Sequence, residues 1–334
     1  MQNIQVLLAR RPNGVPVPDD FSVRETPVVQ PDTGQALIEN IYISLDAGFR
    51  NWMDEDAGDE VLPAMPLGQP VMGLTVGRVI ASKHPNLPLG QLVMGRLAWE
   101  SFSLASDDFL VPLDDDETIP EHYHLGILGD TGMSAYFGLK DIGKPSTEDT
   151  VLISAAAGSV GYVAGQVARI MGAKRIVGFT SSEPKRQRLI QEVGYDEVIN
   201  YRQGNLDEQL QAACPNGIDV YFDNVGGAIL ETVLSQINHG ARIPFCGAVA
   251  DYNSKTPSGP GNLFMLVTQC VRLEGFLTHT KLERYDEARQ QLKTWMNQDA
   301  LQTFVQEYQG VDQCGIAFSD LFAGNNFGKT IVKV

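Results

Sequence analysis

The chain lacks the features that would place it in a membrane, on a nucleic acid or in an oxidising compartment. No apolar run reaches the ~18 residues that a membrane-spanning helix needs. A net charge of −16 over 334 residues disfavours nucleic acid and anionic membranes as partners, because both need a cationic face. The cysteines Cys214, Cys246, Cys270 and Cys314 lie far apart in the second half, which argues against a disulfide framework or a zinc knuckle.

No targeting signal is expected from the residues that open the sequence. The opening residues, MQNIQVLLARRPNG, have no long apolar core and no small-residue cleavage site, and they are better interpreted as a first strand. We therefore expect a cytoplasmic protein. Its length predicts two domains.

What the sequence does contain is a strand, glycine turn, helix and strand at residues 151–186. Residues 151–153 suit a buried parallel strand, and apolar residues at 160, 163, 167 and 171 define one face of a helix that Gly172 would end. Residues 175–179 form the second strand. Gly158 and Gly161 would let the backbone approach a pyrophosphate, to which the free N–H groups at the helix start would donate. Gly165 would let the helix lie close to the sheet.

The glycine motif is incomplete, because Ala156 occupies the place of the first glycine in G-x-G-x-x-G. Small residues chosen for tight helix–sheet packing are the alternative interpretation. The position of the motif between two strands favours dinucleotide binding.

Residues 180–186, which read TSSEPKR, indicate which dinucleotide is bound. An NAD site usually has a carboxylate here for the ribose 2′-hydroxyl, whereas hydroxyls and two cations suit a 2′-phosphate. The expected cofactor is therefore NADP(H). Glu183 leaves open the alternative of a solvated, basic start to the next helix.

The chain is predicted to be an α/β protein in which a nucleotide domain is inserted in a β domain. β-like runs at 4–9, 36–44, 71–82, 91–99 and 109–113 predict a mostly antiparallel domain over residues 1–120. Further helices are expected at 121–129, 133–141, 185–193, 206–213, up to 238 and at 283–296, and strands at 198–201, from 218, at 241–246 and at 271–276. With the strands at 151–153 and 175–179, these make a doubly wound sheet of six parallel strands over residues 121–299. Residues 300–334, with Phe318 and the segment 328–334, look β-like and should return to the first domain.

Further motifs complete a family pattern: Arg10-Arg11-Pro12, GMSAYFGL at 132–139, AAAGSVG at 155–161, FDNVGG at 222–227, Cys246-Gly247-Ala248 and NNFGKTIV at 325–332. The whole layout resembles the medium-chain dehydrogenase/reductase superfamily. More narrowly, it resembles the zinc-independent alkenal/one reductases of the leukotriene B4 dehydrogenase and prostaglandin reductase group, which includes curcumin-reductase-like proteins. The resemblance implies a Rossmann domain inserted in a GroES-like β domain. It also implies a homodimer that uses NADPH to reduce the carbon–carbon double bond of small α,β-unsaturated aldehydes and ketones.

The resemblance and the motifs together give a set of candidate site residues. Cofactor contacts are expected at Gly158, Ser159, Val160, Gly161, Thr180, Ser181, Lys185, Tyr201, Asn224, Cys246, Gly247, Ala248, Tyr252, Phe276, Leu277, Thr278 and Asn326. Tyr252 stands where the family has a tyrosine beside the substrate carbonyl, and it is the candidate catalytic residue. A donor aimed at the developing enolate oxygen contributes ~3–4 kcal/mol. The alternative is a loop tyrosine that packs on its neighbours. Gly48 replaces a tyrosine found in many members, so a wall of the substrate pocket is expected to be missing.

No metal site is expected. A zinc alcohol dehydrogenase of this fold needs a Gly-His-Glu segment and an early cysteine, but this chain has Gly68-Gln69-Pro70 and no cysteine before Cys214. His122 and His124 lack a third ligand nearby. Tyr136 and Lys140 have the spacing of the short-chain dehydrogenase pair, yet they precede the glycine turn, and chance helix spacing explains them. A quinone reductase of the same fold and a non-catalytic NADPH-binding protein remain alternatives.

Overall fold

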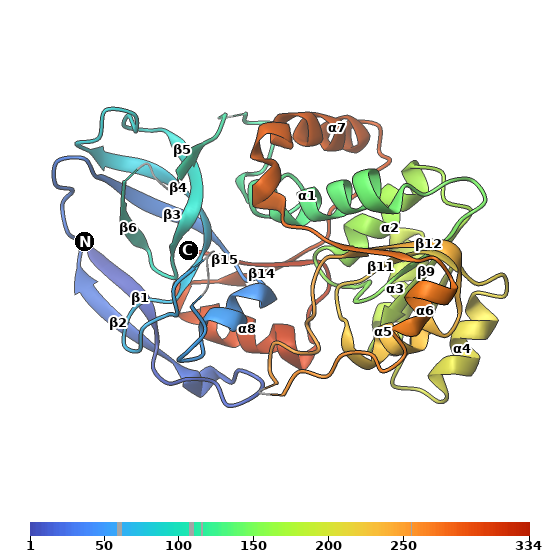
Figure 1. Ribbon diagram of the computed structural model, residues 1–334. Coiled ribbons are helices and arrows are strands. Elements are labelled where there is room, and N and C mark those ends of the chain that lie inside the picture. Colours follow the sequence, from blue (N-terminus) through green and yellow to red (C-terminus); the bar gives the residue numbers. More distant parts are fainter. Residues whose placement is uncertain (59–61, 107–109, 115, 255) are drawn as a thin grey trace. The chain divides into compact units, whose positions relative to one another are not determined.

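The computed structural model describes residues 1–334 except 59–61, 107–109, 115 and 255 (Figure 1). The chain divides into two compact units. The first, which we call the sheet unit, contains Met1–Gly126, Val305–Asn326 and Thr330–Val334. The second, the Rossmann unit, contains Ile127–Phe304 and Phe327–Lys329. The limits of 120/121 and 299/300 drawn from the sequence stay a prediction.

The Rossmann unit is built on six parallel strands in the order β10-β9-β8-β11-β12-β13. The sheet grows outward from β8 in both directions, which is the doubly wound order and confirms the predicted fold class. The strands are β8 (Thr150–Ile153), β9 (Arg175–Thr180), β10 (Glu197–Asn200), β11 (Ile218–Phe222), β12 (Ile237–Phe245) and β13 (Arg272–Gly275).

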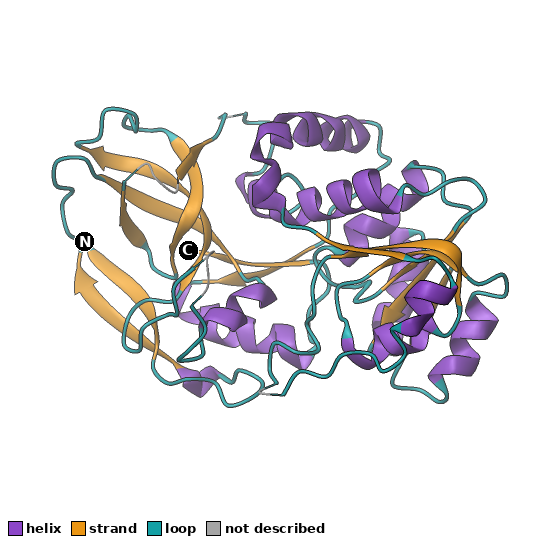
Figure 2. Cartoon of the chain, viewed as in Figure 1, coloured by secondary structure: helices purple, strands orange, loops and turns teal. Residues whose placement is uncertain are grey.

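Helices alternate with these strands along the chain (Figure 2). They are α1 (Asp130–Phe137), α2 (Gly161–Ile170), α3 (Glu183–Arg188), α4 (Leu206–Ala213), α5 (Gly227–Leu234), α6 (Phe264–Thr268) and α7 (Tyr285–Asn297). The helix after the glycine turn ends as expected, because Gly172 adopts a φ of +100°. Gly165 has a different neighbour from the one expected: a Cβ there would lie 2.5 Å from the ring of Tyr195, so the close approach is to this tyrosine.

Four expected helices differ from the observed ones. A helix up to residue 238 was wrong, because α5 ends at Leu234 and Ile237 already pairs with Ile218 of β11. The helix at 121–129 is only a 3₁₀ helix, Glu121–Leu125, since Gly126 leaves the helical region with a φ of −122° and a ψ of −109°. The helix at 133–141 is α1 followed by a π-helical turn, Gly138–Gly143. The helix at 185–193 is likewise α3 followed by a π-helical turn, Leu189–Val193. Strand pairing at Ile237 and the backbone of Gly126 override the local helical pattern in the first two cases.

The sheet unit contains an antiparallel pair, β1-β2, and a seven-stranded sheet in the order β14-β15-β3-β4-β5-β7, with β6 paired to β3. Its strands are β1 (Gln2–Leu8), β2 (Phe21–Pro27), β3 (Ala36–Ser44), β4 (Met72–Ser82), β5 (Leu92–Ala98), β6 (Phe102–Ala105), β7 (Leu110–Pro112), β14 (Val305–Gln309) and β15 (Lys329–Lys333). The strands β2 and β6 were not predicted. β2 is exposed along most of its length, so it shows no apolar alternation. Phe109, the expected first residue of β7, lies outside the described residues.

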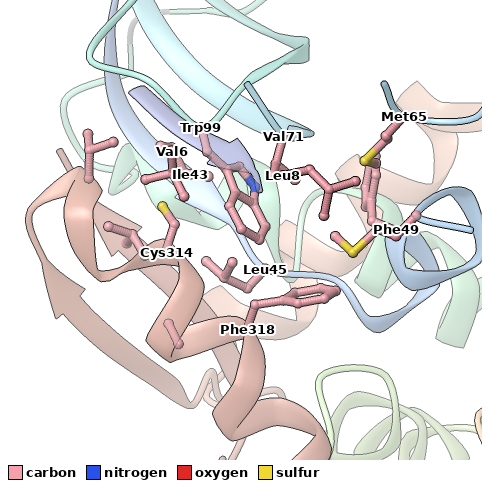
Figure 3. Close-up of a cluster of buried hydrophobic side chains, with 14 of the residues drawn as sticks. Val6, Leu8, Ile43, Leu45, Phe49, Met65, Val71, Trp99, Cys314 and Phe318 are labelled. Carbon is pink, nitrogen blue, oxygen red and sulfur yellow. The ribbon is translucent and has the colours of Figure 1, made fainter. Parts of the chain in front are cut away.

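The core of the sheet unit joins the two ends of the chain (Figure 3). Trp99 packs against Phe318, with ring centroids 5.4 Å apart, and Cys314 belongs to the same buried cluster. Phe318 was expected to be β-like, but it lies in a helix, α8 (Cys314–Ala323). The buried residues Cys314, Ala317 and Phe318 recur at helical spacing, and this period was overlooked in a segment flanked by strands. In the part of the chain that the structure describes, no helix has both the length and the apolarity to cross a membrane.

The Rossmann unit also holds a short piece of the C-terminal segment. Gly328 N–H donates to Ala157 O at 2.9 Å, and Lys329 N–H donates to Phe304 O at 2.8 Å. Gly328 has a φ of +74°, and a Cβ there would lie 2.2 Å from Phe304 O. Residues 327–329 are therefore fixed directly beside the glycine turn.

Candidate cofactor site

The glycine turn joins β8 to α2 and is shaped by close backbone approach. A Cβ at position 161 would lie 2.3 Å from Ala155 O and 2.7 Å from Ala156 Cα, so only glycine fits there. Position 158 is less restricted, with the nearest atom, Ala155 O, at 3.1 Å. The missing first glycine of the motif has a local explanation. The methyl group of Ala156 lies over Gly178 of β9, where a second Cβ would come within 2.8 Å of it.

The turn presents unpaired backbone donors. Among the described residues, the N–H groups of Ser159, Val160 and Gly161 donate to no acceptor, whereas Gly158 N–H is bonded to Ala155 O at 2.9 Å. These three donors stand at the N-terminus of a ten-residue helix. Free N–H groups and the positive end of the helix dipole favour a phosphate at this position.

At the end of β9, polar groups are buried without protein partners. Thr180 Oγ1 is buried and makes no hydrogen bond within the described chain. Lys185, in α3, is half-buried and forms no ion pair or side-chain hydrogen bond with a described residue. Burial, together with the neighbouring Arg202 cation, lowers the pKa of Lys185 to about 8. Ser181 is half-buried beside them, and Tyr201, just beyond β10, is exposed. A buried hydroxyl and two close cations are the groups that a phosphate dianion would satisfy.

Arg202 was missed in the sequence, although it follows Tyr201 directly. Its place was predictable in principle, because β10 is the next strand to β9 and both end at the same sheet edge. The alternative interpretation of this segment was a solvated, basic start to the helix. It describes Arg186, but not Lys185. Arg186 pairs with Glu197 at 2.8 Å and with Glu183 at 3.3 Å. Glu183 thus forms its ion pair with an arginine of its own helix.

The turn after β11 and the turn after β12 both carry candidate residues, and hydrogen bonds connect the two turns. Asn224 Nδ2 donates to Ser154 O at 2.8 Å, and Asn224 O accepts from Val249 N–H at 3.2 Å. Cys246 N–H and Gly247 N–H both donate to Asp223 O, at 2.7 and 3.2 Å. The structure therefore brings Asn224 and the residues 246–248 together.

Tyr252 folds back over this second turn. Ala248 N–H donates to the Tyr252 hydroxyl oxygen at 3.4 Å, and a Cβ on Gly247 would lie 3.0 Å from the same oxygen. Burial raises the pKa of Tyr252. The hydroxyl therefore stays protonated at neutral pH and keeps its proton available for donation. These contacts are compatible with both interpretations of Tyr252, as an oxyanion donor and as a residue that packs on its own loop.

The segment after β13 carries Phe276, Leu277 and Thr278. The Phe276 ring packs on Phe222 with centroids 6.5 Å apart, and both rings approach Gly138, where a Cβ would lie 2.9 and 2.6 Å from them. Thr278 Oγ1 lies 3.4 Å from Asp130 Oδ1, and Leu277 is exposed. Asn326 belongs to the sheet unit and stands one residue before the segment bound to the glycine turn.

Two motifs set aside in the sequence have structural contacts. Lys140 Nζ donates to the Tyr136 hydroxyl at 2.7 Å and pairs with Glu287 at 3.1 Å, so the pair ties the π-helical turn to α7. His122 packs edge-on against Tyr42, with centroids 5.3 Å apart, and burial lowers its pKa. Within the described residues, no group of three or more His, Cys, Asp or Glu side chains is placed to hold a metal ion.

The chain is similar to known oxidoreductases. Residues 4–113 match a family model described as the N-terminal domain of oxidoreductase, and residues 159–294 match one described as zinc-binding dehydrogenase. The NADPH-dependent curcumin reductase of Escherichia coli is 35% identical over 100% of this chain and 97% of its own length. The NADP⁺-dependent 2-alkenal reductase of Nicotiana tabacum is 32% identical over 100% of this chain and 98% of its own length. The crystal structure of CurA from Vibrio vulnificus in complex with NADPH is similar, with a TM-score of 0.92 and 33% identity over 99% of both chains.

Proposed function

Because the chain belongs to the medium-chain dehydrogenase/reductase family, we propose that it is an NADPH-dependent reductase of carbon–carbon double bonds in α,β-unsaturated aldehydes and ketones. NADP(H) as cofactor is supported by the relatives and by the polar groups at the end of β9. The buried Thr180 hydroxyl without a protein partner is the single observation that carries this assignment, because leaving such a group unpaired costs about 1–3 kcal/mol. A 2′-phosphate held by Lys185, Thr180 and Arg202 would remove that cost.

The pyrophosphate is held, in this proposal, by the N–H groups of Ser159, Val160 and Gly161. Asn224 and the turn at residues 246–248 contact the ribose and nicotinamide. Thr278 and Phe276 contribute from the neighbouring strand end. When bound, NADPH supplies the hydride that the β carbon of the conjugated carbonyl accepts.

Tyr252 is the residue that we assign to the developing enolate oxygen. Its hydroxyl accepts from Ala248 N–H, which leaves its own proton to donate outward. Because burial raises its pKa, Tyr252 acts as a neutral hydrogen-bond donor and not as a tyrosinate base. No second acid is required, since the α carbon of the enolate can take its proton from water.

We propose that this chemistry proceeds without zinc, although the family that residues 159–294 match is described as zinc-binding dehydrogenase. The proposal is supported by the lack of a ligand cluster among the described residues and by Gly68-Gln69-Pro70 in place of a Gly-His-Glu segment. Hydrogen bonding to the enolate oxygen would then supply the stabilisation that a metal supplies elsewhere.

The test is a substrate panel with chelator-treated protein. NADPH oxidation should be fastest with linear enals and enones, slower with quinones, and unchanged when zinc is added. A preference for quinones would support the quinone-reductase alternative. NADPH binding without turnover of either class would support a non-catalytic protein.

We further propose a homodimer that pairs through the free edge of β13. In the described chain β13 pairs only with β12, and its neighbourhood exposes Phe264 (72%), Val267 (66%) and Leu277 (53%). An exposed strand edge beside large apolar side chains is normally covered, and a second copy of the same edge would continue the sheet. Sedimentation should show a dimer that Val267→Asp dissociates. A monomeric wild-type protein would contradict this assembly.

A further inference from the structure

Asp223 is a buried carboxylate that the proposed chemistry does not use. It stands directly after β11, and its side chain is 0% exposed. Its Oδ1 atom accepts four hydrogen bonds, from Ser154 Oγ at 3.0 Å, Tyr221 OH at 2.8 Å, Val225 N–H at 2.9 Å and Gly226 N–H at 3.0 Å. One oxygen thus fixes the start of the turn that carries Asn224.

The main chain of Asp223 holds the second turn. Its carbonyl accepts from Cys246 N–H and Gly247 N–H, and its own N–H donates to Pro244 O at 3.0 Å. The loop that follows Gly247 contains Tyr252. A single residue therefore connects the ends of β8, β11 and β12, and all of these ends belong to the candidate nicotinamide site.

Ser154 extends this arrangement to the Asn224 side chain. Ser154 Oγ donates to Asp223 Oδ1 and accepts from Asn224 N–H at 2.8 Å. Asn224 Nδ2 is bound to Ser154 O, and within the described residues Asn224 Oδ1 accepts no hydrogen bond. The amide oxygen of Asn224 is therefore left for a donor from a ligand, such as a ribose hydroxyl.

The second carboxylate oxygen of Asp223 shows that this geometry is maintained at a cost. Oδ2 is buried and has no hydrogen-bond partner in the described chain. Burial raises the pKa of Asp223, although the bonds from Gly226, Val225, Tyr221 and Ser154 act in the opposite direction. A buried oxygen without a hydrogen-bond partner is costly and requires an explanation. We explain it by the need for an Oδ1 atom that accepts four hydrogen bonds at this point.

We propose that Asp223 is the positioning residue for the nicotinamide half of the cofactor, acting through the Asn224 turn and the Cys246–Gly247 turn. This inference rests on the proposed function in assuming NADPH at the site. It predicts that Asp223 affects the nicotinamide half and leaves the adenosine half unchanged, which a general structural role would not do.

The experiment compares the affinities of two ligands by calorimetry. NADPH occupies both halves of the site, whereas adenosine 2′,5′-bisphosphate occupies only the adenosine half. Asp223→Asn keeps one acceptor oxygen but loses the charge, so we expect NADPH to bind about tenfold more weakly and the bisphosphate to bind as in wild type. Lys185→Ala is the matched control, because it should weaken both ligands together.

Ser154→Ala serves as a second variant should Asp223→Asn fold poorly. It leaves Asp223 three of its four donors and removes the acceptor for Asn224 N–H, so a smaller loss confined to NADPH is expected. Equal weakening of both ligands, or no weakening of either, would overturn the assignment. Failure of the proposed function is seen separately, as wild-type protein that binds NADPH but reduces no enone.

Discussion

The two halves of the candidate cofactor site satisfy their polar groups in opposite ways. At the end of β9, the Thr180 hydroxyl is buried without a partner and Lys185 faces another cation. At the end of β11, one oxygen of Asp223 receives four hydrogen bonds from the protein itself. In our proposal an anionic ligand completes the first half, which would then determine which cofactor binds. The second half is ordered by the protein's own hydrogen bonds, and in our proposal it would determine how the reactive ring is held.

The glycine turn lies between these halves, and its disruption should have the largest effect. Gly161→Ala places a methyl group 2.3 Å from Ala155 O, so the backbone must move and the three free N–H groups lose their alignment. We expect NADPH affinity to fall at least ~100-fold, because charge-assisted hydrogen bonds contribute about 1.5–3 kcal/mol each. Gly158→Ala meets the same oxygen at 3.1 Å and should lose less. Equal losses in the two variants, measured by calorimetry, would remove the steric argument.

Tyr252→Phe should separate turnover from binding in the nicotinamide half. Removing one oxyanion donor typically lowers kcat about 100- to 1000-fold. The dissociation constant for NADPH should change less than kcat does, because the Tyr252 hydroxyl accepts from Ala248 N–H of its own loop. Steady-state kinetics with an enone and NADPH fluorescence titration measure the two quantities. Unchanged kcat would assign Tyr252 to loop packing alone.

Lys185→Ala should separate the two cofactors in the adenosine half. Loss of one cation from a phosphate site should weaken NADPH about 10- to 100-fold and leave NADH unchanged. Lys174→Ala is the control, because Lys174 is exposed and lies 3.7 Å from Glu148. A parallel loss for NADPH and NADH would refute phosphate recognition by Lys185.

The smallest expected effect is on pH dependence. Since the pKa of Lys185 is lowered to about 8, the cation is lost from the free protein as the pH rises through that value. NADPH affinity should then fall by up to about tenfold per pH unit above 8, while NADH affinity stays flat. Lys185→Arg should flatten the NADPH profile, because arginine stays charged. A profile that Lys185→Arg does not change would place the titrating group elsewhere.

Much of the Rossmann unit was predictable because local and tertiary signals agree there. The apolar run of β8, the glycine turn and the face of α2 all indicate the same βαβ unit, and the strand order follows from it. By contrast, α8 was missed although its buried positions, Cys314 and Phe318, recur at helical spacing. This period is short, and the strand-like runs on either side of it outweighed it.

In the candidate site, too, some features could be predicted from the sequence and others could not. Ala156 looked like a defect in the glycine motif, and only the neighbouring strand shows that Gly178 makes room for its methyl group. The proximity of Lys185 to Arg202 and the hydrogen bond from Ser154 to Asp223 likewise depend on which strands are adjacent. A linear motif identifies residue types, but the sheet order decides which of them share a ligand.

The most direct test of the account follows the hydride itself. Chelator-treated protein would reduce a linear aliphatic enone with NADPH deuterated at the transferred position, and the product would be examined by NMR. We predict a saturated ketone with deuterium on the former β carbon. Deuterium on the carbonyl carbon of an allylic alcohol, or turnover that returns only when zinc is supplied, would contradict it.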